Sequence, residues 1–200
     1  MINYSSEDPP HNGDLIFVLA GRENRKRYGL ELFRQGFSPR ILFSVSRFEI
    51  RRFAALSLPV PMDLLKLASP VPPPQRHFFV LFEGYRAQVE YVRPRRFGTL
   101  TEIESLLRWL EGHSEIHSLL IISNKAHLRR IRMCCESLLD ANFEITLIAA
   151  PDGSNGGGSS ESTTAVLLEM LKALLYWVVL RLRGDRQRPS RKRRRTETQN

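Results

Sequence analysis

A histidine and an arginine follow a run of apolar residues in the segment LLIISNKAHLRRIR, residues 119–132. His127 and Arg130 stand three positions apart, which places two side chains next to each other on the surface of a helix. Ser123 and Asn124 precede them and offer further hydrogen-bonding groups. An imidazole that titrates near neutral pH, a planar guanidinium and two short polar side chains can together bind a phosphate or a carboxylate. The segment is therefore a candidate anion site.

Each of these residues also has a structural interpretation. A lone His127 would more often be a surface or capping residue, and a lone Arg130 part of a solvated basic helix face. Thr99 and Glu102 raise the same choice, because they stand at the spacing of a capping box, in which each side chain satisfies a backbone N–H of the same helix start. Capping and ligand contact can coexist at one helix start.

The chain around the segment predicts a strand, a turn and a helix. Residues 119–122 are continuously apolar, as in a parallel strand that is covered on both faces. Ser123 and Asn124 are good N-cap residues. Apolar residues then recur at helical spacing at Leu128, Ile131, Cys135 and Leu138. The carboxyl end of such a strand is where open α/β sheets bind ligands, and the start of the next helix favours an anion.

Strands and helices are expected to alternate along most of the chain. The patterns predict strands at residues 14–20, 40–45, 77–83, 87–91, 119–122 and 144–149, with the third and fourth paired as a hairpin around Gly84. They predict helices at residues 23–35, 46–56, 100–110 and from the turn after 122 to about 139. This order predicts a single Rossmann-like α/β domain with a mostly parallel sheet and helices on both faces.

Two more strand-to-helix turns should open at the same edge of the sheet as residues 123–130. The first turn holds a single glycine, so it has neither the dinucleotide-binding fingerprint nor the phosphate loop, and ordinary NAD or NTP binding is not supported. The candidate ligand-binding residues at these turns are Gly21, Arg22, Ser44, Arg47, Glu49, Thr99, Glu102, Ser123, Asn124, His127 and Arg130.

These motifs do not indicate a reaction. The G-x-S-x-G elbow does not occur, and the only base near Ser123 is His127 on the same segment. The five histidines show no metal-ligand spacing, so no metal site is predicted. Cys134 and Cys135 are adjacent on a predicted helix and point about 100° apart, which excludes a disulfide between them and fits a reducing cytoplasm.

The segment 119–132 resembles the signature of the YdcF/ElyC/SanA family, a family of domains of unknown function. Three further stretches match that family in its order: residues 18–36, 39–49 and 98–106. Ser46 departs from the pattern, because the family more often has glycine there. The resemblance implies a site at the motif residues, a link to bacterial envelope biogenesis and, for some members, S-adenosylmethionine as cofactor. Members often carry an amino-terminal membrane anchor, which residues 1–13 do not resemble.

Composition divides the chain into five parts. We expect a flexible arm at 1–13, the α/β domain at 14–151, a Gly/Ser linker at 152–164, an apolar helix at 165–182 and a disordered basic tail at 183–200. Within the domain, residues 58–75 hold six prolines and are expected to form a surface excursion without strands, either a lid or an insertion without function.

The net charge of +9 at pH 7 is concentrated at one end of the chain. Nine Lys or Arg and two acidic residues lie at 181–200, so this stretch carries +7 and the remaining 180 residues carry +2. The preferred function is binding of a small anionic or nucleotide-like ligand by a cytoplasmic protein. The alternative is a non-enzymatic scaffold at the inner face of a membrane, held by the apolar helix and the tail. Because the basic tail directly follows the apolar helix, an anionic lipid surface is a slightly better partner for it than nucleic acid.

Overall fold

The computed structural model describes residues 2–3, 11–92, 98–139 and 143–151 of the 200-residue chain. The chain divides into two units, Met1–Gly158 and Ser159–Asn200, and all of the described residues belong to the first. The predicted linker, apolar helix and basic tail therefore lie outside the described residues. The first unit is an α/β fold whose sheet is mostly parallel, as the alternating pattern predicts.

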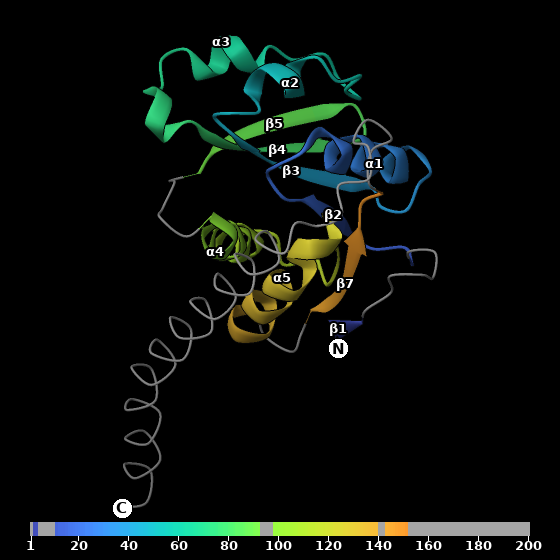
Figure 1. Ribbon diagram of the computed structural model, residues 1–200. Helices are drawn as coiled ribbons and strands as arrows, with labels where there is room; N and C mark the ends of the chain where they lie inside the picture. Colours follow the sequence, from blue (N-terminus) through green and yellow to red (C-terminus); the bar gives the residue numbers. More distant parts are fainter. Residues whose placement is uncertain (1, 4–10, 93–97, 140–142, 152–200) are drawn as a thin grey trace, which may run out of the picture. The chain divides into compact units, whose positions relative to one another are not determined.

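The described strands form one sheet in the order β1-β7-β6-β2-β3-β4-β5 (Figure 1). Its parallel part contains β1 (Ile2–Asn3), β7 (Glu144–Ala149), β6 (Ser118–Ser123), β2 (Leu15–Val18) and β3 (Arg40–Ser46). The hairpin β4 (His77–Glu83) and β5 (Arg86–Tyr91) then adds two antiparallel strands beside β3. The predicted hairpin around Gly84 is thereby confirmed, and the predicted bounds of β4 and β7 match those observed.

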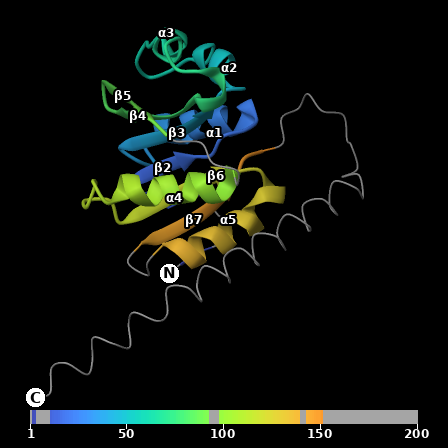
Figure 2. The ribbon, with the colours of Figure 1, turned by 90° about the vertical axis from the view of Figure 1, so that its left-hand side faces the viewer.

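Helices lie on both sides of the sheet. One side carries α1 (Glu23–Arg34), α2 (Ile50–Ala54) and α3 (Leu64–Ala68), whose apolar residues share a core with alternate residues of the central strands. The other side carries α4 (Gly98–Leu110) and α5 (Lys125–Leu138), which lie in front of the sheet in Figure 2, with α1 behind it. Ile131, Cys134 and Cys135 form the buried face of α5.

Three sequence-based expectations need correction. The arm at 1–13 contains β1, which pairs with the open edge of β7, and its last residue Gly13 donates to the Phe37 carbonyl at 2.9 Å. The proline-rich stretch forms no strand, as expected, but it is not only a surface excursion, because it holds α3 and the 3-10 helix η1 (Pro73–Gln75), and Leu64 and Ala68 are buried in the core. The helix expected at 46–56 begins only at Ile50, which leaves Phe48 71% exposed in the preceding turn.

The connections of the parallel strands diverge between β2 and β6, which are direct neighbours. From β2 the chain passes through α1 to β3 on one side, and from β6 it passes through α5 to β7 on the other. Because α1 and α5 lie on opposite sides of the sheet, their first turns separate at the carboxyl ends of β2 and β6 (Figures 1 and 2). In open α/β sheets this switch point is the usual place for a ligand.

Candidate functional site

The first turn of the site follows β2 and depends on a glycine. Gly21 has φ +139°, a conformation that side chains with a Cβ rarely adopt, and an added Cβ would lie 2.7 Å from Arg25 Nη1. The turn leads into α1 with Arg22 at the N-cap position, where its side chain makes no capping hydrogen bond. Arg22 is exposed, so its guanidinium faces solvent at this edge of the sheet.

Glu102 crosses from α4 to the ends of β2 and β3. Its Oε1 accepts the backbone N–H of Ala20 at 2.8 Å, and Ser44 also hydrogen-bonds its carboxylate. Ser44 Oγ lies 2.7 Å from His77 Nε2, so the buried Glu102 and Ser44 and the half-buried His77 form a chain across β3 and β4. Glu102 therefore contacts another element and does not close a capping box with Thr99. Thr99 and Glu102 have the spacing of a capping box, but their side chains bond to different partners.

Burial raises the pKa of Glu102 to about 7, against the hydrogen bonds from Ser44 and Ala20, which lower it. Burial also lowers the pKa of His77, so this imidazole is neutral at pH 7. When Ser44 donates to the Glu102 carboxylate, its oxygen accepts from the Nε2–H tautomer of His77. Ser44 is fully buried and lies between His77 and Glu102. This order differs from that of a hydrolase triad, in which the histidine lies between the serine and the carboxylate.

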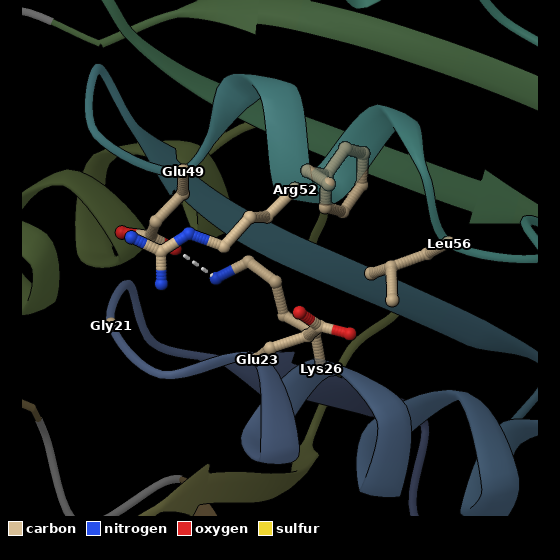
Figure 3. A pocket seen from close by; sticks show the side chains of 7 residues that line it. Gly21, Glu23, Lys26, Glu49, Arg52 and Leu56 are labelled. Atoms are coloured by element: carbon tan, nitrogen blue, oxygen red, sulfur yellow. Dashed lines mark hydrogen bonds and ion pairs between the residues drawn. The ribbon is translucent and has the colours of Figure 1, made fainter.

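Lys26 and Glu49 form a buried ion pair below the second turn. Lys26 Nζ contacts Glu49 Oε2, and the two side chains are 2% and 8% exposed. Burial lowers the pKa of Lys26, and the negative charge of Glu49 opposes this shift. Ser46 Oγ donates to the other oxygen of Glu49. Figure 3 shows the Lys26 ammonium directed toward Glu49, with Arg52 reaching across from α2.

Only a small cavity lies beside this ion pair. It is bordered by Gly21, Glu23, Lys26, Glu49 and Arg52, among others, and its volume is about 10 Å³ (Figure 3). This is the space of one water molecule. Glu49 is therefore a structural partner of Lys26 in this conformation, and direct contact with a larger ligand would require Arg52 or the turn at Gly21 to move.

Arg25 spans the switch point between β2 and β6. Its Nε donates to Asn124 Oδ1 at the start of α5, and its Nη1 donates to the Ala20 carbonyl at 2.6 Å. Burial is the main cause that lowers the pKa of Arg25; the negative charges of Glu102 and Glu49 oppose this shift, and the positive charges of Arg130 and Arg22 add to it to a smaller extent. Arg25 thus lies within electrostatic reach of two other guanidinium groups and of two carboxylates. Asn124 occupies the N-cap position of α5 but does not cap it, because its side chain binds Arg25.

Thr99, His127 and Arg130 form a second group, on the α4 and α5 side of the sheet. Arg130 Nε donates to Thr99 Oγ1 at 3.2 Å, and Arg130 Nη2 lies 3.1 Å from His127 Nδ1. His127 and Arg130 are half-buried, whereas Thr99 is buried at the start of α4. The predicted proximity of His127 and Arg130 on one helix face is confirmed, and neither residue belongs to the buried apolar face of α5.

Ser123 and Arg47 differ from the other candidates. Ser123 is fully buried at the end of β6, and its Oγ has no hydrogen-bond partner among the described residues. Such an orphan hydroxyl is uncommon in a protein interior. Arg47 is exposed and lies 4.4 Å from the centre of the Phe48 ring, at the border of a different cavity between α2 and α3. Arg47 is therefore the candidate that does not join the others at the switch point.

Sequence reasoning missed the buried Arg25 and Lys26 and the half-buried His77. Arg25 and Lys26 stand in the basic run NRKR, which reads as a solvated helix face. The spacing along α1 could have indicated burial of Lys26, because residues three or four apart lie on the same helix face. Lys26 is four residues before Leu30, a core residue, and three before Gly29, which touches the sheet. His77 starts an apolar strand, and nothing in the sequence pairs it with Ser44.

The remaining nucleophiles and metal ligands form no further site in the described residues. Burial raises the pKa of Cys134 to about 12, and it also raises the pKa of Cys135, so both thiols are unreactive. Within residues 11–92, 98–139 and 143–151, no three His, Cys, Asp or Glu side chains gather as metal ligands. In the same ranges no helix has the length and apolarity of a membrane span.

Comparison of the chain with models of protein families, with curated proteins and with solved structures finds no match. The candidate site is therefore described by its own geometry. It consists of a buried polar layer of Arg25, Lys26, Ser44, Glu49 and Glu102, bordered by the more accessible Arg22, His127 and Arg130.

Proposed function

We propose that the chain binds a small anionic or nucleotide-like ligand at the carboxyl edge of its sheet, between the first turns of α1 and α5. The observation that carries this proposal is the convergence on Arg25 of the positive charges of Arg22 and Arg130 at the switch point, where Arg25 also bonds to Asn124 and Ala20. An anion placed there would be attracted by these guanidinium groups and by the positive end of the α1 dipole.

Two carboxylates lie within electrostatic reach of Arg25 and partly offset this positive charge. Glu49 is bound to Lys26, and Glu102, with a pKa of about 7, is about half protonated at neutral pH. A guanidinium that binds a phosphate or carboxylate can form two parallel hydrogen bonds, which favours a planar or tetrahedral oxyanion over chloride.

The finer assignments belong to this proposal. The order of the parallel strands around β2 and β6 supports a Rossmann-like description of the domain. The resemblance of residues 119–132 and of the three other stretches to the YdcF/ElyC/SanA family supports a role for His127, Arg130, Thr99 and Glu102, makes S-adenosylmethionine a ligand to test, and supports a link to envelope biogenesis.

The test compares ligand affinity with stability in three variants of the full chain. Inorganic phosphate, AMP and S-adenosylmethionine are titrated calorimetrically into the wild type, His127→Ala and Arg130→Ala, and each protein is melted in parallel. We expect at least one probe to bind the wild type, and each substitution to weaken it by about ten- to a hundredfold, the loss of one charge-assisted hydrogen bond. Arg129→Ala is the matched control, because Arg129 is the exposed neighbour on the same helix. It should change neither property.

The opposite outcome is that His127 and Arg130 stabilise the fold and do not bind the ligand. Arg130 connects α5 to α4 through Thr99, and this contact alone could account for its position. Lowered melting temperatures with wild-type affinity in both variants would assign His127 and Arg130 to packing, and the site would have to be sought elsewhere. The membrane-surface alternative rests on residues 165–200, which lie outside the described part of the chain.

A further inference from the structure

A second cavity lies away from the switch point, between α2, α3 and the segment before β4. Its volume is about 370 Å³, which falls in the range of small-molecule sites. We call it the α2–α3 cavity. None of its described lining residues is acidic. Four arginines border it: Arg47, Arg51, Arg52 and Arg76.

Arg52 also borders the smaller cavity that Glu23 and Glu49 line, whereas Arg47, Arg51 and Arg76 do not. None of the four forms an ion pair with another described residue. Arg76 is held in place by backbone oxygens, because its Nε donates to the Val71 carbonyl at 2.7 Å and its Nη2 to the Ser69 carbonyl at 3.3 Å. Four guanidinium groups around one cavity favour a ligand with several negative charges, because each added charge can meet another arginine. A single carboxylate would leave three of them uncompensated.

Apolar groups of unusual exposure stand beside the charges. Phe48 is 71% exposed and Leu65 is 47% exposed, and both line the cavity. Arg47 Cζ lies over the Phe48 ring, 4.4 Å from its centre, in a cation–π contact, and Phe48 stays 71% exposed beside it. The exposed part of this ring can stack a planar ring of a ligand, while Arg51, Arg52 and Arg76 bind its charged part.

We propose that the α2–α3 cavity binds an organic polyphosphate, with the di- or triphosphate on the arginines and the organic group on Phe48. This site goes beyond the anion site at the switch point. Arg52 borders both cavities, but the other residues that define the two sites differ. The two proposals can therefore fail separately.

The test uses the full chain and two exposed arginines that make no ion pair with a described residue. Inorganic triphosphate and ATP are titrated into the wild type, the double variant Arg47→Gln/Arg51→Gln, and Phe48→Ser. We expect the double variant to weaken both probes by at least about tenfold and to reduce the salt dependence of binding. Phe48→Ser should weaken ATP several-fold and leave inorganic triphosphate unchanged. Arg86→Gln, an exposed arginine of β5, is the matched control and should bind like the wild type.

Three results would overturn the proposal. The first is no binding of either probe at millimolar concentration. The second is equal weakening by Arg86→Gln, which would show nonspecific attraction to a basic protein. The third is binding of phosphatidylglycerol vesicles that depends on Arg51 while triphosphate does not bind, which would replace the small molecule by a lipid surface. Loss of AMP or phosphate binding in His127→Ala with unchanged triphosphate binding would support two separate sites.

Discussion

Glu102 is the residue whose protonation is coupled most directly to folding. Its carboxylate is removed from water and receives hydrogen bonds from Ala20 and Ser44, yet burial dominates and raises its pKa to about 7. In the unfolded chain the same carboxyl titrates near its ordinary value of 4.5. Between these two pKa values the folded state holds a proton that the unfolded state has released, so stability falls as the pH rises through this window.

We predict that Glu102→Gln removes this pH dependence. The titration of Glu102 should cost the wild type about 3 kcal/mol of unfolding free energy between pH 4.5 and 8, because a shift of one pKa unit corresponds to roughly 1.4 kcal/mol; the lowered pKa of His77 acts in the opposite direction in both proteins. The amide keeps an oxygen that can accept the Ala20 N–H and carries no charge to bury, so the variant should be the more stable protein at pH 8. Urea unfolding at a series of pH values measures both proteins. Glu31→Gln, on an exposed part of α1, should retain the wild-type slope; the same slope in Glu102→Gln would disprove the assignment.

Lys26 and Arg27 are neighbours in the sequence but differ in environment, which permits a matched comparison. Lys26 is paired with Glu49 in the interior, whereas Arg27, 68% exposed, pairs with Glu23 at the surface. Lys26→Met should lower the unfolding free energy by about 3–5 kcal/mol, because it leaves a buried carboxylate unpaired. Arg27→Met should cost less than about 1 kcal/mol. Chemical denaturation at pH 7.5 gives both values.

The reference for this pair is the double variant Lys26→Met/Glu49→Leu. Replacing both charges by apolar groups should recover much of the stability that Lys26→Met loses, because no charge remains buried. If the double variant is less stable than Lys26→Met alone, Glu49 has a further partner that stabilises the fold.

At the scale of elements, the approach of α1 to the sheet depends on Gly29. A Cβ at this position would lie 2.6 Å from Val18 Cγ2, and the β-branched valine can move little. Gly29→Ala should therefore destabilise the protein by about 1–3 kcal/mol through overpacking, although alanine is the better helix former. It should also shift the first turn of α1, and with it Arg25 and Lys26.

Gly98→Ala is the control for this prediction. Gly98 begins α4 and has nothing within 4 Å of an added Cβ, so alanine should be neutral or stabilise by up to about 1 kcal/mol. Thermal melts of both variants distinguish the effects. Equal stability changes in Gly29→Ala and Gly98→Ala would mean that helix propensity outweighs the contact with Val18.

At the scale of the whole molecule, charge is divided unevenly along the chain. Residues 186–200 hold seven basic residues and one acidic residue, and they contribute no apolar core pattern. We predict that deleting them leaves the melting temperature unchanged within about 2 °C and weakens binding to anionic liposomes. A variant of full length with glutamine at the seven basic positions should match the deletion. A melting temperature several degrees lower in the truncated protein alone would indicate that the tail packs against the rest of the chain.

The sequence by itself determined where most strands and helices lie. Continuous apolar runs predicted β3, β6 and β7, and the spacing of apolar residues predicted α4 and α5, because burial on a sheet or along one helix face leaves a local periodic pattern. Turn chemistry at Gly84 predicted the hairpin. The strand-to-helix turns also predicted that the candidate residues lie near one edge of the sheet, since parallel strands end on the same side.

Only the tertiary structure decided which charged side chains are buried and what they bind. Glu102 and Ala20 are 82 residues apart, and Arg25 and Asn124 are 99 apart, so neither contact leaves a periodic signal. The same holds for β1, two residues long, which pairs only because β7 presents an open edge. An arginine or glutamate has the same letter whether it faces water or a distant partner. The cost of burying its charge is met by that partner, and packing alone brings the two together.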